Sequence, residues 1–387
     1  MSIAFKDLQF SRPEFSKYLA KKRSRRFEKV QWSLRPYGDV DEQAVTALYQ
    51  KCFSEKLNRE EWQWKYRRNP CGEPLILVAE DSSTGRLIGH AAAIPCRIKI
   101  GSHEETAYLL VDTMVDRIAR GHGLHGHLTA HLCDQVFKKN GLPLGLPNEK
   151  AHNKGLIQGG AGLLTTLQVY LRIFRNSSLL KKHIGALSYV LLLIGKFEGL
   201  RLKTSRNALK VERVHFFGSE VNDLWERIRN KFQITSVRTA ERLNWRYFQN
   251  PSADYDVYAV LSGEKWLGYA VTKIDTKEGF KLGMLVDLFF DPAVPDAGEA
   301  LLVQSSSHWK KEKIDIGVIV FSGPEDYGRL FRKAGFLKNR WKQLRQFRLM
   351  ADFLGMKNCE SAAIKRHENT LISEKNWLWN LGDSDII

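Results

Sequence analysis

Hydrophobic and polar positions follow the same order twice along the chain. From residue 32, a strand pattern leads through a capped turn into a helix pattern, and the same succession starts again at residue 211. Each half continues with a hairpin, a strand, a helix, a strand and a helix. Apolar residues alternate in the strand patterns and recur near every 3.6 residues in the helix patterns. This order predicts a mixed α/β domain of about 140 residues that occurs twice.

A short aromatic motif marks the two copies. The pattern Trp-basic-Tyr-x-x-Asn-Pro occurs at residues 64–70 and again 181 residues later at 245–251. A hairpin pattern containing Gly89 or Gly268 follows each copy, and then an apolar strand with two aspartates. These aspartates are Asp112 and Asp116 in the first half and Asp287 and Asp291 in the second. We expect the tryptophan of each motif to anchor packing rather than to form a substrate platform.

Composition fits this picture of two folded domains. The chain has 387 residues, of which 43% are hydrophobic and 27% are charged, which excludes a mainly disordered, collagen-like or disulfide-stapled protein. Its five cysteines are scattered and form no C-x-x-C pair, which favours a reducing compartment and argues against structural zinc. The N-terminus carries charges where a signal peptide needs an apolar run. We therefore expect a cytoplasmic protein.

The positive charge is concentrated in two segments. The net charge is +17, of which residues 1–36 hold +7 and residues 176–210 hold +6. Either segment is explained by a solvated face or by contact with an anionic partner, such as a membrane surface or an acidic carrier protein. The apolar stretch Ile184–Gly195 is too short to span a bilayer. It fits a helix in the plane of the inner membrane surface, or a helix packed between the two domains.

These patterns divide the chain into five parts. We expect a basic arm, a first domain, a basic amphipathic linker helix, a second domain and a C-terminal tail. Their bounds are 1–29, 30–175, 176–210, 211–345 and 346–387.

A glycine-rich turn follows the central strand of the first half. The strand pattern Leu109–Val115 leads into a turn and then into a helix pattern with one apolar face. Glycines allow successive backbone N–H groups to point into one concavity, and the positive end of the helix dipole adds to it, so the turn suits a pyrophosphate. The sequence has neither the P-loop nor the dinucleotide-binding glycine spacing. The candidate phosphate contacts are Arg120, Gly121, His122, Gly123, Leu124, His125 and Gly126.

The turn resembles motif A of the GNAT superfamily of acyl-CoA N-acyltransferases, R/Q-x-x-G-x-G/A. Arg120 and Gly123 match, and His125 takes the final small position. The preceding VDTMV resembles the family strand that splays from its neighbour and bonds the pantetheine arm through its backbone, which places Met114 and Val115 at the cofactor. The segment from residue 141 to 160 resembles the next strand and motif B. The resemblance implies that Asn148 contacts the pantetheine.

The resemblance covers roughly residues 30–175 and 211–345. After Asp291 the second half has no Arg/Gly turn, so it resembles a degenerate copy without a cofactor site. The fold expected is therefore α/β, an α+β mixed sheet, with two tandem GNAT-like acyl-CoA N-acyltransferase domains.

The resemblance implies direct transfer of an acyl group from acyl-CoA to a primary amine in a ternary complex. Acetyl-CoA is the donor expected by default, and similar bacterial tandem proteins act on amino sugars, amino acids or other small amines. The candidate catalytic residues are Asp112 and Glu149 as bases and His152 as acid or base. For Asp112 a shared structural role competes with catalysis, because Asp287 repeats it in the half without the turn.

Three other functions compete with this one. A Fem-type aminoacyl transferase would use charged tRNA, which fits the basic arm but not the phosphate turn, so nucleic acid is not the partner we expect. A long-chain acyltransferase would use an acyl carrier, and a non-catalytic CoA-binding adaptor would need no base. His127 and His131 have a spacing that can bind zinc, but no third ligand is evident, so we expect no metal.

Overall fold

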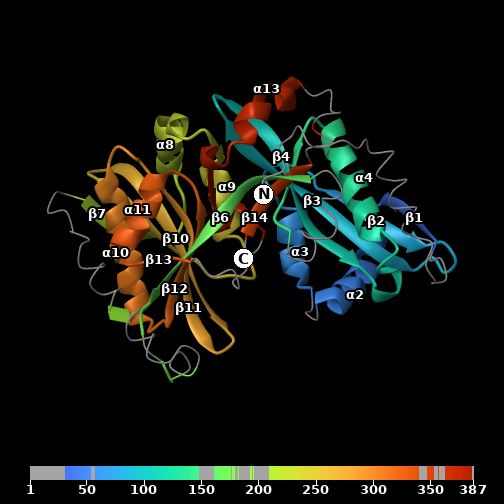
Figure 1. Ribbon diagram of the computed structural model, residues 1–387, viewed down its shortest axis with the longest axis horizontal. Coiled ribbons are helices and arrows are strands. Elements are labelled where there is room, and N and C mark those ends of the chain that lie inside the picture. The colour runs from blue at the N-terminus through green and yellow to red at the C-terminus, as the bar shows by residue number, and fades with distance from the viewer. Residues whose placement is uncertain are drawn as a thin grey trace. The chain divides into compact units, whose positions relative to one another are not determined.

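The computed structural model divides the chain into two compact units (Figure 1). The first takes residues 1–98, 103–165 and 348–372, and the second takes 99–102, 166–347 and 373–387. Neither unit is one continuous stretch of chain. The structure describes residues 31–53, 57–147, 161–175, 177–178, 182, 192–193, 195, 209–339, 347–352, 356 and 362–385.

The first unit is built on a mixed sheet. β1 pairs antiparallel with β2, β2 antiparallel with β3, β4 parallel with β5, and β5 antiparallel with β14. β3 and β4 are neighbours through the hairpin that joins them. The strands are β1 (Trp32–Pro36), β2 (Leu75–Asp81), β3 (Leu87–Ile100), β4 (His103–Val115), β5 (Leu142–Gly145) and β14 (Phe347–Asp352), with β6 (Ala161–Ile173) starting in this unit.

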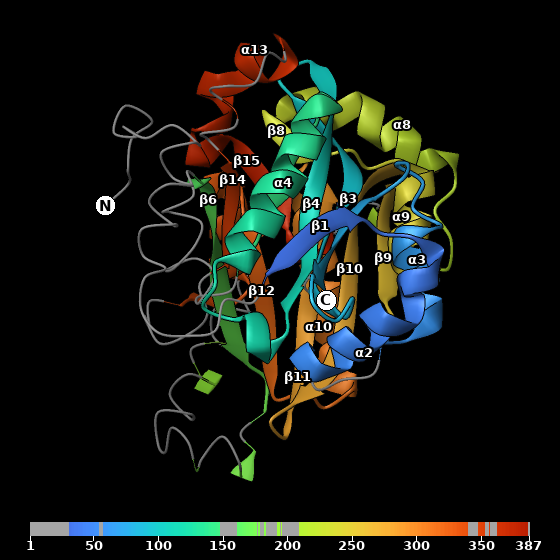
Figure 2. The same cartoon turned by 90° about the vertical axis from the view of Figure 1, so that its right-hand side faces the viewer.

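Helices cover both faces of this sheet. A Cβ at Gly89 would meet Leu124 and Leu128 of α4, whereas the neighbouring His90 contacts Trp62 of α3. Successive strand residues point to opposite faces, so α3 and α4 lie on opposite sides of β3. Figure 2 shows α4 lying along the strands. The helices are α2 (Glu42–Phe53), α3 (Arg59–Tyr66), α4 (Leu124–Lys138) and α13 (Ala362–Leu371), with short 3-10 turns η2 (Asp39–Asp41) and η3 (Arg117–Ala119).

The second unit shows the same succession of pairings. β7 pairs antiparallel with β9, β9 with β10 and β10 with β11; β11 is parallel to β12, and β12 antiparallel to β6. Two short strands complete the sheet, because β13 pairs with β6 and β15 lies between β12 and β8. The strands are β7 (Leu209–Val214), β8 (Ile234–Ser236), β9 (Asp256–Ser262), β10 (Lys265–Lys277), β11 (Phe280–Phe290), β12 (Ile316–Ser322), β13 (Leu337–Lys338) and β15 (Trp377–Asn380).

The helices of the second unit also follow the order of the first. α8 and α9 come before β9, and α10 follows β11 and packs against β9 and β10. The helices are α8 (Ser219–Ile228), α9 (Ala240–Tyr247), α10 (Pro295–Lys311) and α11 (Glu325–Lys333), with 3-10 turns η5 (Arg229–Lys231), η6 (Glu374–Asn376) and η7 (Leu381–Asp383). Each unit is thus a mixed α/β structure, as the sequence pattern predicts.

The repeated aromatic motif forms the same short helix in both units. α3 is capped by Asn58, whose side chain accepts from the Glu60 N–H, and α9 is capped by Thr239, whose hydroxyl accepts from the Arg242 N–H. Trp64 and Trp245 are buried within their units. Their expected role as packing anchors is therefore confirmed.

Among the residues that the structure describes, no helix is long and apolar enough to cross a membrane. The basic arm 1–29 lies outside the described residues, as does almost all of the linker 176–210. The contact of these segments with an anionic partner stays a prediction from sequence.

Candidate functional site

The glycine turn after β4 adopts a backbone that glycine accommodates best. Gly121 has a φ of 87° and Gly123 a φ of 84°, both in the left-handed region. Gly123 caps α4, whose first turn holds no acidic residue. Among the described residues, a Cβ on Gly121 would meet nothing within 4 Å, and one on Gly123 only an atom of His127 at 3.8 Å. The turn is therefore open on the side of these Cα atoms.

The start of α4 presents backbone donors at this turn. The first N–H groups of a helix have no acceptor within the helix. Here they belong to Leu124, His125 and Gly126, since the N–H of His127 is the first to bond back, to the Gly123 carbonyl at 3.2 Å. Burial lowers the pKa of His125, so its ring stays neutral at pH 7. The positive end of α4 thus comes from the backbone and the helix dipole.

Arg120 joins this turn to the end of β4. Its side chain is exposed, and its Nε donates to the carbonyl of Val115 at 3.0 Å. Asp116 begins the intervening turn by accepting from the N–H of Ile118 at 3.3 Å, and it pairs with Arg86. The predicted residues Val115 and Arg120 therefore lie together beside the open face of the turn.

The outer half of β4 extends beyond the end of its parallel neighbour. Pairing between β4 and β5 ends at Leu110 and Gly145, where β5 itself ends, whereas β4 continues to Val115. Among the described strands only β3 and β5 pair with β4. Met114 is buried and Val115 half-buried on this stretch. Beyond Leu110, no described strand pairs with the edge of β4 on the side of β5, and we call this stretch of edge the splay of the first unit.

Asp112 lies at the start of this outer half and is held by two side chains of α3. Its carboxylate accepts from Lys65 Nζ at 2.9 Å and from the Tyr66 hydroxyl at 2.5 Å. Burial alone would raise the pKa of Asp112, but the Lys65 ammonium and the Tyr66 hydrogen bond outweigh it and keep that pKa below its usual range. An ion-paired carboxylate of this kind holds its charge and has little affinity for an additional proton.

The second unit contains the same tyrosine–aspartate pair. Tyr247 takes the place of Tyr66 in the repeated motif, and its hydroxyl donates to Asp287 at 3.1 Å. Tyr269 also donates to Asp287, at 2.9 Å, and Arg238 pairs with it at 3.3 Å. The pair belongs to the architecture of both units, which favours the structural role for Asp112.

His90 was missed by sequence reasoning. It occupies the position of Tyr269, directly after the repeated glycine, and this difference between the copies was the available signal. The ring is fully buried beside Trp62, and its Nδ1 lies 2.9 Å from the carbonyl oxygen of Asp112. Burial lowers the pKa of His90, so the ring is neutral. Within the described residues its Nε2 has no hydrogen-bond partner.

Three predicted residues, Asn148, Glu149 and His152, lie outside the described residues. His122 is half-buried in the turn. The ring of His127 packs on Trp32 at 4.9 Å between centroids, and His131 bonds a carbonyl of its own helix. Across the described part of the chain, no three His, Cys, Asp or Glu side chains cluster as metal ligands would.

The corresponding turn of the second unit has a different chemistry. Asp291 accepts from the N–H of Ala293 at 2.9 Å. α10 then begins with Pro295, which has no N–H, and Asp296 lies in its first turn. A helix start with a carboxylate and one donor fewer is a poor place for a phosphate.

A strand also fills the splay of the second unit. Pairing between β11 and β12 ends at Leu285 and Ile319. Beyond it, Phe321 pairs with Gln168 of β6 on one edge and with Asn380 of β15 on the other. β15 therefore runs along the edge of β12 that β11 has left.

Buried polar contacts fix β15 and the turn after it in that place. Asn380 donates to Asp287 at 2.8 Å, and the Asp383 carboxylate accepts from Arg238 at 2.9 Å. Trp377 and Trp379 are fully buried. The C-terminal segment is thus part of the interior of the second unit.

The comparison with protein families matches part of the first unit. Residues 33–146 match the model described as the acetyltransferase (GNAT) domain. Enzymes of this family transfer an acyl group from acyl-CoA to an amine. The matched region contains β4, the glycine turn and α4. A comparison with curated proteins gives no match to this chain.

Solved structures resemble a larger part of the chain than the family model matches. A probable N-acyltransferase from Enterococcus faecalis V583 is 12% identical with a TM-score of 0.59, covering 84% of this chain and 74% of that one. A GCN5-related N-acetyltransferase from Anabaena variabilis has the same identity and TM-score and covers 84% and 73%. N-myristoyltransferase of Saccharomyces cerevisiae, solved with myristoyl-CoA, is 12% identical with a TM-score of 0.51 and covers 86% and 82%. At this identity the likeness shows the fold.

Proposed function

We propose that the chain is an N-acyltransferase with tandem GNAT-like domains and one acyl-CoA site, which lies in the first unit. The observation that carries the proposal is the open glycine turn beside the unpaired outer half of β4. The second unit has neither feature in usable form.

The turn fits the pyrophosphate of CoA. The left-handed glycines Gly121 and Gly123 leave the backbone open to close approach, and the N–H groups from Leu124 to Gly126 lie at the positive end of α4. The guanidinium of Arg120 lies beside the turn and carries charge for an outer phosphate oxygen. We assign His122 and His125 to the same binding turn.

The edge of β4 fits the pantetheine arm. An amide-rich chain that enters this splay finds the backbone groups of Met114 and Val115 where β5 no longer binds them. We further propose that Asn148, which follows β5, contacts the same arm.

The second unit is in this proposal a degenerate copy. Its splay already holds β15, and its helix start offers Pro295 and Asp296 in place of glycines.

When bound, acyl-CoA supplies a thioester whose acyl group passes to the amine nitrogen as the carbon–sulfur bond breaks. The protein must take one proton from the ammonium group of the acceptor, and the departing thiolate must gain one. We propose Glu149 and His152 for these transfers. Asp112 remains a third candidate, but its ion pair with Lys65 favours a role in holding β4.

We propose acetyl-CoA as donor and a small primary amine, such as an amino sugar or amino acid, as acceptor. The basic segments 1–36 and 176–210 are proposed to meet an anionic membrane surface or an acidic carrier. The protein would then be cytoplasmic, or peripheral on the inner membrane surface.

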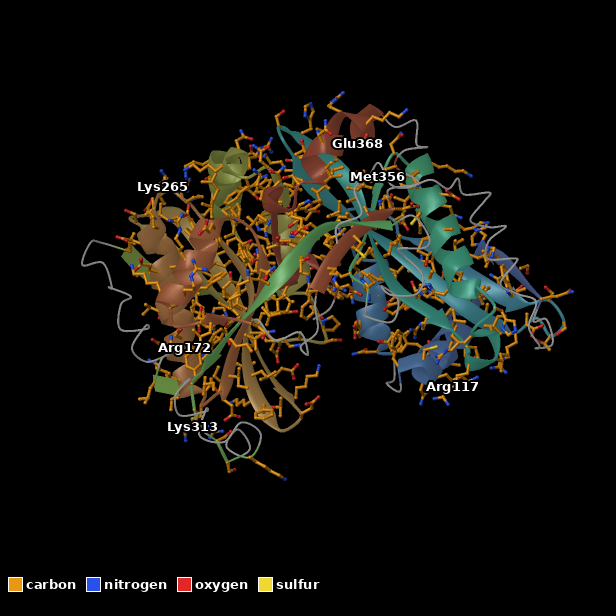
Figure 3. The ribbon with its side chains drawn as sticks, in the orientation of Figure 1. Arg117, Arg172, Lys265, Lys313, Met356 and Glu368 are labelled. Atoms are coloured by element: carbon orange, nitrogen blue, oxygen red, sulfur yellow. The ribbon has the colours of Figure 1, made fainter. Side chains whose placement is uncertain are left out.

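The proposal is tested by release of CoA thiol from acetyl-CoA in the presence of glucosamine, lysine or spermidine. We expect amine-dependent release by the native chain, and a loss of about ten- to hundredfold at sub-saturating acetyl-CoA for Arg120→Glu, because a charged phosphate contact becomes a repulsion. The matched control is Arg117→Glu, whose exposed side chain lies three residues away and points to solvent (Figure 3). It should retain most of the activity.

Two results would contradict the proposal. Equal losses in both variants would mean that the turn acts only through general charge. Binding of charged tRNA or of an acyl carrier, with no binding of acetyl-CoA, would transfer the chain to one of the competing classes.

A further inference from the structure

The structural detail that goes beyond the proposed function is the contact between His90 and the backbone of Asp112. The side chain of His90 is fully buried, and its Nδ1 lies 2.9 Å from the Asp112 carbonyl oxygen. A carbonyl oxygen only accepts, so Nδ1 carries the proton and donates. The neutral ring is thus fixed in one tautomer by a backbone group of the neighbouring strand.

Asp112 is held in an uncommon backbone conformation by this contact and by α3. Its φ is 46°, in the left-handed region that side-chain-bearing residues rarely adopt. The carboxylate is held by Lys65 and Tyr66 while the carbonyl is held by His90. Strained backbone that is fixed from both ends is typical of functional sites.

The position of Asp112 in β4 determines where the next backbone N–H points. It is the second residue after Leu110, where pairing between β4 and β5 ends, and it precedes Met114 and Val115. The C=O and N–H of one trans peptide point to opposite sides. With the Asp112 carbonyl turned to the His90 ring, the N–H of Thr113 points away from that ring.

The second unit shows that the fold does not require this contact. Tyr269 replaces His90 there, and its hydroxyl bonds the carboxylate of Asp287 rather than a carbonyl. Asp287 is described in the structure and has no positive φ. The contact between a histidine ring and this backbone carbonyl therefore occurs in the first unit, which has the glycine turn, and not at the corresponding place in the second unit.

We propose that His90 is a positioning residue that holds the Asp112–Thr113 peptide so that the Thr113 N–H faces the thioester carbonyl of acyl-CoA in the splay. This inference rests on the proposed function. A fixed donor at that point polarises the carbonyl that the amine attacks, because it needs no reorientation when charge develops on the oxygen.

The test compares His90→Asn with His90→Leu in the full chain. The Asn side chain keeps an N–H close to the position of Nδ1, whereas Leu fills the space without a donor. The measurement is the ¹³C chemical shift of [1-¹³C]acetyl-CoA bound to each variant, together with the ratio of dissociation constants for CoA and acetyl-CoA. His131→Leu, at an exposed position on α4, serves as the matched control.

We expect a downfield carbonyl shift on binding to the native chain, to His131→Leu and to His90→Asn. His90→Leu should bind acetyl-CoA without that shift, and its preference for acetyl-CoA over CoA should fall by about two- to tenfold. Circular dichroism of each variant separates loss of the donor from loss of the fold.

The inference is overturned if folded His90→Leu gives the native shift and preference. It is also overturned if folded His90→Asn loses both as fully as His90→Leu, since Nε2 would then be the group that matters. No binding of acetyl-CoA by the native chain would instead refute the proposed function.

Discussion

At the scale of residues, the decisive feature is a buried anion whose neighbours keep it charged. Asp112 pairs with Lys65 where the two side chains are 15% and 9% exposed. Removing one partner of a buried ion pair leaves the other charge buried without a counter-charge. The resulting loss of folding stability is larger than the net stabilisation by the intact pair. The contacts of Asp112 with α3 thus help to fix the backbone of β4 where its pairing with β5 has ended.

We predict that Lys65→Met destabilises the protein by about 3 kcal/mol at pH 7, because the Asp112 carboxylate is left buried without its cation. Urea unfolding followed by tryptophan fluorescence measures this. Lys265→Met, which removes an equally long cation at an exposed site, is the control and should change stability by less than about 0.5 kcal/mol.

The same variant has a defined dependence on pH. The folded pKa of Asp112 is depressed in the native chain, so its stabilising contribution is present above the ordinary carboxyl pKa and is lost as pH falls through the folded value. Lys65→Met removes that depression. The difference in stability between the two proteins should therefore shrink toward low pH, and a difference that stayed constant would show that the ion pair is not its cause.

Residue contacts of this kind were only partly predictable from sequence. The repeat of Tyr66 and Asp112 as Tyr247 and Asp287 indicated a shared structural role. The role of His90 did not follow, because its partner is a carbonyl 22 positions away that only the hairpin register brings near. The change from Tyr to His between the two copies indicates that the side chain has a different partner. It does not identify the atom to which the histidine ring bonds.

At the scale of elements, we propose that the glycine turn and the outer half of β4 form one site. Helix starts, turns and strand patterns depend on neighbouring residues, so the sequence indicates them well. The turn after β4 and the apolar face of α4 are where the pattern places them. The filling of the second splay by β15 could not be predicted, since it joins Phe321 to Asn380 through long-range pairing.

The turn supplies a prediction at this scale. Gly121→Val should destabilise the protein by about 1–2 kcal/mol, because the left-handed backbone disfavours a side chain. It should also weaken acetyl-CoA binding more than tenfold, since the new side chain occupies the space we assign to phosphate. Isothermal titration calorimetry measures the binding.

Gly85→Val is the control for that prediction. Gly85 also has a positive φ, 68°, and also lies in open space, but in the turn between β2 and β3. It should lose similar stability and keep its affinity. Equal weakening of binding in both variants would show that strain alone, and not the phosphate turn, reduces affinity.

At the scale of the whole molecule, the two units share one succession of strand pairings and differ after their central strands. In the first unit no described strand pairs with the outer edge of β4 beside the turn, whereas in the second unit β15 pairs with the outer part of β12. The net charge of +17 lies mainly in residues 1–36 and 176–210 and thus mainly outside this site. In our proposal the CoA phosphates need only the turn and Arg120, so we propose that the surplus charge serves a second anionic contact.

The central claim is that the chain has one acyl-CoA site and that it lies at the glycine turn. The most direct measurement is the stoichiometry of acetyl-CoA binding to the full chain by isothermal titration calorimetry, repeated with Arg120→Glu and Arg117→Glu. We predict one molecule per chain, with binding weakened about ten- to hundredfold by Arg120→Glu and little changed by Arg117→Glu. Two molecules per chain, or binding that Arg120→Glu leaves intact, would contradict it.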